Sequence, residues 1–256
     1  MLKKASVLVL VLCLLTVGAT PVQAKDYPVY GLLEFRNHIE PEAKLIKSEH
    51  GLSVYAYRNA APTESQVNTL FQVWSKLPYA VKQTRYNKPV RVYFVPDPAT
   101  DPNCRARGRY LELGAFLGLG DIILYPSAID GTYNLAYVFL HELGHMFDEA
   151  IEDSSESLDY FIAMFDDLQI DGLREKLNKS PYESPLKLNK MLSEDFADAF
   201  ASYAGLYWGI KEVAPPDEFL CERERKAYQH RFVFIEKLVN KAEEKRHSIP
   251  TERFQF

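Results

Sequence analysis

Cysteine is scarce in this sequence, with three residues among 256. Cys13 lies in the apolar segment at the N-terminus, and neither Cys104 nor Cys221 belongs to a C-x-x-C pair. The sequence therefore gives no support for a metal site built from cysteines. Two interpretations of Cys104 and Cys221 stay open: one disulfide bond in an oxidising compartment, or two independent thiols.

Long apolar runs are also missing after residue 24, where no segment approaches the roughly 20 residues that a membrane-spanning helix needs. The apolar run at residues 5–17 follows Lys3 and Lys4, and residues 22–24 (V-Q-A) form a small-residue cleavage pattern. This arrangement is typical of a secretory signal peptide rather than of a membrane anchor. We expect residues 1–24 to be removed and the remaining chain to be extracellular.

The sequence has no excess of basic residues. Its formal charge is −5, and the loss of Lys3 and Lys4 with the leader changes this to −7. A net negative charge argues against nucleic acid or an anionic membrane surface as the main partner. With 47% hydrophobic residues, the rest of the chain has the composition of a globular protein, for which we expect a single domain and a monomer.

The pattern of apolar residues predicts an α+β fold. Thr63 and Gln66 form a capping-box pattern ahead of a helix over residues 64–77. The glycine-rich residues 113–120 favour a bulged hairpin. Three segments have the alternating, β-branched or aromatic composition of strands: residues 52–57, 90–95 and 121–126.

The same pattern suggests how the domain is organised. We expect residues 25–60 to be an N-terminal extension, residues 61–150 an α/β lobe and residues 151–256 a helical lobe. A turn-rich break at residues 179–185 precedes the helices of the second half, which include a charged amphipathic region over residues 216–246. One loop contains three alternating arginines, which are either solvated or grip an acidic peptide: Arg105, Arg107 and Arg109.

The segment that points to chemistry is the H-E-x-x-H sequence at residues 141–145. It lies in a stretch predicted to be helical from about residue 132 to 150, with an apolar face formed by Leu140, Leu143, Phe147 and Ile151. On a helix, His141 and His145 share one face, where both imidazoles can reach one tetrahedral metal and Glu142 sits beside its bound water. Gly144 would allow another backbone to pass close by. Five letters can match by chance, so the interpretation depends on further residues.

A catalytic zinc site usually has three protein ligands, so a third ligand is needed downstream. Glu194 is the best candidate, in a predicted helix that Ser193 would cap and Glu194 would open. Asp198 lies one turn later on the same face, where it could accept a proton from the outer nitrogen of a ligand histidine. The sequence therefore predicts a zinc site built by His141, His145 and Glu194.

Residues 141–148 (H-E-L-G-H-M-F-D) and 194–200 (E-D-F-A-D-A-F) resemble the catalytic domain of the anthrax toxin lethal-factor family and the secreted Pro-Pro endopeptidases related to it. The resemblance implies a zincin-like metalloprotease fold, with a small mixed sheet, an exposed edge strand and a helical C-terminal lobe. It also implies a secreted zinc metalloendopeptidase with one zinc per chain, Glu142 as general base and a preference for proline near the scissile bond.

The substrate is expected to be a protein or peptide bound in extended form. In zinc peptidases generally, such a chain adds to an exposed sheet edge that precedes the motif helix. Residues 122–125 are the predicted edge here. Two alternatives remain open, a catalytically silent binding protein on the same fold and a protease of broad specificity.

The donor that stabilises the oxyanion is the part of the site where the resemblance is loosest. The family uses a tyrosine about two helical turns before the ligand glutamate, and that count reaches Lys187, with no tyrosine nearby. Tyr182 is the nearest tyrosine upstream and is our candidate. Tyr203, Lys187 and His230 are the alternatives.

Overall fold

The structure is a computed structural model. It describes residues 35–83, 88–96, 114–118, 120–125, 135–152, 154–170, 185–211, 213 and 218–247. The predicted leader, the arginine loop and Tyr182 lie outside these residues, as do Cys104 and the side chain of Cys221. The predictions made for these parts of the chain therefore stay predictions.

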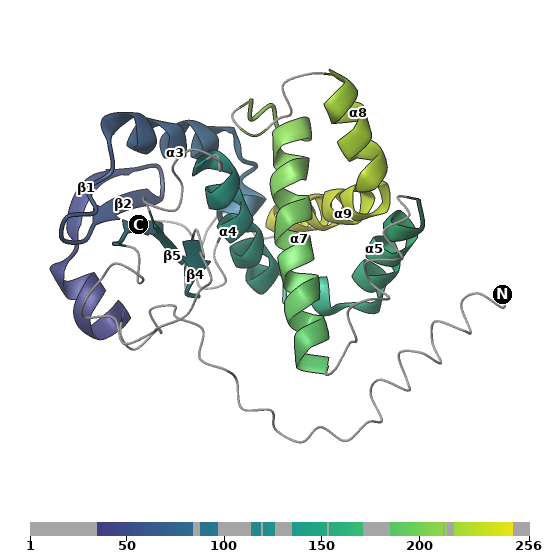
Figure 1. Ribbon diagram of the computed structural model, residues 1–256, viewed down its shortest axis with the longest axis horizontal. Helices are drawn as coiled ribbons and strands as arrows, with labels where there is room; N and C mark the ends of the chain where they lie inside the picture. Colours follow the sequence, from purple (N-terminus) through teal and green to yellow (C-terminus); the bar gives the residue numbers. More distant parts are fainter. Residues whose placement is uncertain are drawn as a thin grey trace.

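The described chain has an α+β fold with a mixed sheet of five strands in the order β1-β2-β3-β5-β4 (Figure 1). The central strands β2, β3 and β5 run parallel, while β1 and β4 pair antiparallel at the two edges. Helix α3 (Glu64–Lys76) provides the crossover from β2 to β3. The strands are β1 (Lys44–Glu49), β2 (Leu52–Ala56), β3 (Val90–Phe94), β4 (Gly114–Phe116) and β5 (Asp121–Leu124).

Several predicted elements are confirmed. Helix α3 begins with the predicted capping box, in which the Gln66 backbone N–H donates to Thr63 Oγ1 at 3.2 Å and the Thr63 N–H donates to Gln66 Oε1 at 2.8 Å. The glycine-rich segment forms the predicted hairpin between β4 and β5. Gly118 and Gly120 adopt φ of 81° and 85° in its turn, a backbone region that suits glycine.

The N-terminal extension contains more structure than the sequence predicted. A short π-helix η1 (Phe35–Ile39), a 3₁₀-helix η2 (Glu40–Glu42) and strand β1 precede β2. Strand β1 escaped prediction because it lies at the sheet edge and most of its side chains are exposed, including Leu45 and Ile46. Without a buried face, a strand has no alternation in its sequence.

The prediction that residues 122–125 form an exposed edge is wrong. Strand β5 pairs with β3 on one side and with β4 on the other, and all four of its residues are buried. Ile122 and Leu124 pack into the core beneath α3 and α4, while Ile123 and Tyr125 pack into a second core on the opposite face. The unbroken apolar run is what a strand covered on both faces requires. On this side of the sheet, β4 is the edge.

The second core is closed by the N-terminal segment. Phe35 and Ile39 of η1 pack onto Tyr93 and other residues of the sheet. Asp121 is fully buried and accepts hydrogen bonds from Arg91 Nε at 2.7 Å and Arg36 Nη2 at 2.5 Å. A buried carboxylate is costly unless it is paired, so Arg36 fixes the segment to the first residue of β5, while Arg91 of β3 completes the pairing.

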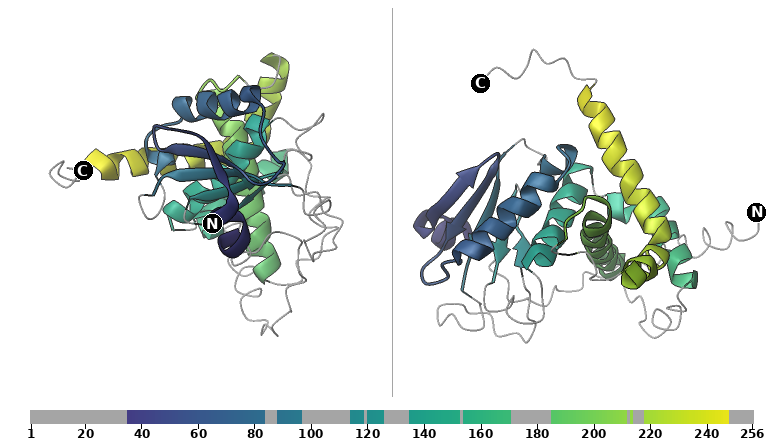
Figure 2. Two further views of the ribbon diagram at one scale, coloured as in Figure 1. Left: turned by 90° about the vertical axis from the view of Figure 1, so that its left-hand side faces the viewer. Right: turned by 90° about the horizontal axis from the view of Figure 1, so that it is seen from above.

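Only helices follow β5 in the described part of the chain, as expected for the second lobe. In Figure 1, α4 lies between the sheet and α7. Figure 2 shows that α9 lies on the side of α7 that faces away from the sheet. None of the described helices is long and apolar enough to span a membrane. The helices are α4 (Leu135–Ala150), η5 (Ser154–Glu156), α5 (Leu158–Ile170), α7 (Pro185–Tyr207), α8 (Glu218–Ala227) and α9 (Gln229–His247), and the short η3 (Ala80–Lys82) follows α3.

Helices α4 and α7 pack closely at Gly144. The predicted apolar residues Leu140, Leu143 and Phe147 are fully buried, and Ile151 packs against the core just after the helix ends. A Cβ atom at position 144 would lie 2.9 Å from the Cα of Ala197 on α7. The sequence prediction that Gly144 lets another backbone pass close by is confirmed.

We predict that Gly144→Ala lowers the free energy of unfolding by about 1 kcal/mol or more, measured by urea denaturation. The gain in helix propensity, about 1 kcal/mol, is smaller than the cost of pushing two backbones apart. Asn68→Ala on the exposed face of α3 is the control and should increase stability, because no packing opposes the better helix former. A Gly144→Ala protein as stable as the native one would show that α4 and α7 separate at no cost.

Candidate metal centre

The candidate site lies between α4 and α7. Helix α4 carries His141 and His145 one turn apart, and α7 carries Glu194. The predicted start of the second helix is wrong: α7 begins at Pro185, so Ser193 does not cap it and Glu194 lies in its middle. The residues before Ser193 are therefore part of the same helix. Glu194 lies within a continuous helix and not at its first turn.

The ligand atoms have the separations expected for one tetrahedral metal. His141 Nε2 lies 3.2 Å from His145 Nε2 and 3.4 Å from Glu194 Oε2, and the remaining pair is 3.9 Å apart. Bonds of about 2.0–2.1 Å to zinc place neighbouring tetrahedral ligands roughly 3.3 Å apart. Two separations match this value and the third is somewhat longer, so the three residues fit a zinc ion. They form the one such cluster in the described part of the chain.

Each histidine also has a partner for its outer nitrogen. His141 Nδ1 lies 2.8 Å from Asp198 Oδ1, and His145 Nδ1 lies 3.1 Å from Ser193 Oγ. When each Nδ1 carries the proton and donates it, each Nε2 presents a lone pair to the centre of the cluster. Asp198 therefore lies where the sequence analysis placed it, and Ser193 has a role at His145 that the analysis did not assign.

Tyr137 is a second residue that the sequence analysis missed. Its hydroxyl donates to Asp198 Oδ1 at 3.0 Å, so Asp198 is held from two sides. The spacing contained the signal, because Tyr137 lies four residues before His141 and so shares its helix face. A polar aromatic residue one turn before the motif was sufficient reason to consider it.

Glu142 differs from the ligand glutamate in its surroundings. Its side chain belongs to α4 and is buried, whereas Glu194 is half exposed. The negative charge of Glu142 raises the pKa of the adjacent His141, and Glu142 is not a member of the ligand cluster. A buried carboxylate beside the ligands is suited to exchanging a proton with a bound molecule.

Two of the alternative oxyanion donors do not lie at the site. Tyr203 is nine residues after Glu194, which places it on the opposite side of α7 and about 13 Å along the axis. There its ring stacks on Tyr207. His230 lies at the start of α9 and its Nδ1 contacts Asp167 at 2.8 Å. The side chain of Lys187 lies outside the described residues, as does Tyr182.

Comparisons with protein-family models, with curated proteins and with solved structures find no match for this chain. Any functional conclusion must therefore be drawn from the site itself. The relevant observations are the ligand separations, the partners of the two imidazoles and the burial of Glu142.

Three carboxylates give the metal-free site a negative electrostatic potential, which acts on His141. Burial lowers the pKa of His141, but hydrogen bonds to Asp198 and Glu194 and the charge of Glu142 outweigh it and raise the pKa to about 10. In the metal-free protein, the imidazole of His141 is therefore protonated on both nitrogens, and so positively charged, at neutral pH. A metal ion, which needs the neutral imidazole, would release that proton on binding.

This shift predicts how the stability of the metal-free protein depends on pH. Because the folded-state pKa lies above the unfolded value of about 6.5, the stabilising effect of the His141 proton is complete below pH 6.5. It is lost as the pH rises through 10. Denaturation in the presence of a chelator should show this fall, and Asp198→Asn should reduce it. The same pH dependence in both proteins would contradict the assignment to His141.

Proposed function

We propose that this chain is a secreted zinc metalloendopeptidase, a glutamate-zincin similar to the catalytic domain of the lethal-factor family. The observation that carries the proposal is the arrangement of His141, His145 and Glu194, whose ligand atoms have separations suited to tetrahedral zinc. The two imidazoles are also oriented through Nδ1, as in ligand histidines generally.

The donor set favours zinc over other common ions. Two imidazole nitrogens and one carboxylate leave a fourth position for water or substrate, which is the pattern of catalytic zinc sites. Calcium takes six to eight oxygen ligands, and magnesium prefers an octahedral set of oxygens. The residues at this site supply too few oxygens for either ion.

The chain's own residues then perform the proton transfers. Zinc, when bound, supplies a Lewis acid that polarises the scissile carbonyl and lowers the pKa of a coordinated water. Glu142 accepts a proton from the attacking water and delivers it to the leaving amine. Asp198 and Ser193 hold the two imidazoles in the orientation that keeps Nε2 directed at the site.

We propose the edge strand β4 as the place where an extended peptide substrate binds. In the described part of the chain, β4 pairs with β5 and has no strand on its outer side, and it lies beside α4. A substrate added to this edge would run past the motif helix, so we assign to β4 the role that the sequence analysis gave to residues 122–125. Proline near the scissile bond fits an extended chain, because its φ is fixed in that region.

The test is hydrolysis of a peptide library by the mature protein, with and without a chelator. We expect cleavage that stops with the chelator, returns with zinc and is enriched at sites close to proline. Cleavage that ignores proline at every position would remove the specificity while leaving the zinc chemistry. Zinc binding without any cleavage would favour the silent binding protein instead.

We predict that substituting the two glutamates affects zinc binding differently. Glu142→Ala should keep about one zinc per chain while hydrolysis falls at least 100-fold, since general acid–base catalysis typically contributes 10²–10⁴-fold. Glu194→Ala should weaken zinc binding itself, since it removes a ligand. Metal analysis and peptide cleavage measure both, with the exposed Asp159→Asn on α5 as a control. Loss of zinc in the first variant and full occupancy in the second would reverse the assigned roles.

We further predict that Tyr182 donates a hydrogen bond to the oxyanion. A phenol with an ordinary pKa near 10 stays protonated at neutral pH and can donate without losing its proton. Tyr182→Phe removes only the donor, so turnover should fall by about 100-fold or more while zinc binding is kept. Unchanged turnover would transfer the role to another group.

A further inference from the structure

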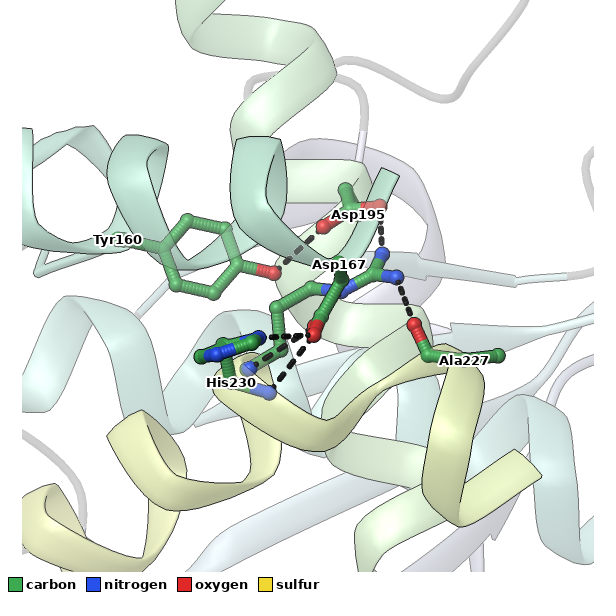
Figure 3. A network of polar contacts seen from close by, with 6 residues as sticks. Tyr160, Asp167, Asp195, Ala227 and His230 are labelled. Carbon is green, nitrogen blue, oxygen red and sulfur yellow. Dashed lines mark hydrogen bonds and ion pairs between the residues drawn. The ribbon is translucent and has the colours of Figure 1, made fainter. Parts of the chain in front are cut away.

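A network of polar contacts includes Asp195, the residue that follows Glu194 (Figure 3). Asp195 follows Glu194 on α7 and therefore projects about 100° further round the helix axis. While Glu194 faces the histidines, Asp195 accepts hydrogen bonds from Tyr160 of α5 at 2.7 Å and from Arg231 of α9 at 2.6 Å. Two neighbouring residues of α7 thus belong to two different sites.

Arg231 joins four helices through one guanidinium group. Its side chain is buried, and its Nη1 binds Asp195 of α7. Its Nε donates to Asp167 of α5 at 2.9 Å, and its Nη2 donates to the carbonyl of Ala227, the last residue of α8, at 2.8 Å. The guanidinium also lies over the ring of Tyr228, 4.1 Å from its centre. The planar fork of an arginine can make these contacts together, which a lysine cannot.

Asp167 holds the start of α9 in the same network. It is fully buried and accepts hydrogen bonds from the backbone N–H groups of His230 at 2.7 Å and Arg231 at 3.0 Å. These N–H groups belong to the first turn of α9, where helices leave their donors unpaired. Asp167 therefore caps α9 from a different helix, and this fixes the position from which Arg231 reaches α7.

The network opposes a rotation of α7 that would displace Glu194. The packing of Gly144 against Ala197 sets the distance between α4 and α7. Phe196 and Phe200 of α7 add aromatic contacts to Tyr160 and Phe147. Rotation would move Glu194, which is half exposed, relative to His141 and His145. The hydrogen bonds to Asp195 oppose that rotation because they act one residue away.

We propose that Tyr160, Asp195 and Arg231 are positioning residues for the metal centre, which set its zinc affinity by holding Glu194 against the two histidines. The proposal rests on the zinc site proposed above. It predicts that the affinity for zinc falls when the network is weakened, even though none of these three residues contacts the metal ligand atoms.

The test measures zinc affinity by competition with a chromogenic chelator in the full-length mature protein. Tyr160→Phe is the mildest variant, because it keeps the ring that packs on Phe196 and Phe234 and removes one hydrogen bond to Asp195. Arg231→Lys keeps the charge and removes the fork. By analogy with outer residues of other metal sites, we expect zinc affinity to fall on the order of tenfold in each.

A matched control separates positioning from general loss of stability. Val239→Ala changes a buried core residue of the same helix, α9, about two turns beyond Arg231 and outside the network. It should lower stability and leave zinc affinity unchanged. If it weakens zinc binding as much as Tyr160→Phe does, the network has no specific role.

A double-mutant cycle with Glu194→Ala identifies the route of the effect. If Tyr160 acts through Glu194, Tyr160→Phe should weaken zinc binding in the native protein but not in the Glu194→Ala background. Equal losses in both backgrounds would overturn the proposal. The native protein distinguishes the two failures: no zinc binding there would contradict the proposed function, whereas native binding with an unaffected Tyr160→Phe variant would contradict the positioning role alone.

Discussion

The site depends on the close approach of two helices at a single glycine. Gly144 lies between His141 and His145 in the motif, and any side chain there would meet the backbone of Ala197. The glycine that permits the close approach therefore lies within the same five-residue motif as the two histidines of the site. At this separation, Glu194 Oε2 of α7 lies 3.4 Å from His141 Nε2 on α4.

The two helices contribute different kinds of group to the site. Helix α4 supplies two imidazoles and the buried Glu142, while α7 supplies Glu194 as the third candidate ligand and Ser193 and Asp198 as partners for the imidazoles. Glu194 and Asp198 lie one turn apart on one face of α7, and Ser193 directly precedes Glu194. A single rotational setting of α7 thus serves the ligand and both supporting contacts at once.

Local sequence patterns predicted much of the fold and the ligand set. The capping box at Thr63, the strands at β2 and β3 and the end of α4 at Ala150 follow from patterns contained in a few neighbouring residues. The three candidate ligands could be proposed because H-E-x-x-H and a later glutamate have a known chemical meaning. Only the structure shows that these three residues lie close together.

The errors arose where tertiary contacts decide. Strand β5 seemed a suitable edge by its position in the sequence, but β4 pairs with its outer side, and residues of η1, α3 and α4 cover its two faces. Ser193 looked like a cap because serine is common before helices, and only the position of His145 reveals its actual partner. Arg231 could not be connected with Asp167, because their contact spans 64 positions in the chain.

The long range of that contact has a consequence for the order in which the protein assembles. The two histidines leave the ribosome well before Glu194, and the arginine that restrains α7 follows later still, near the end of the described chain. Such a contact cannot form before its later residue is synthesised, and closing the long loop between the two residues costs chain entropy. The nascent chain therefore offers two histidines but no completed site. The zinc site proposed above is therefore a property of the finished protein.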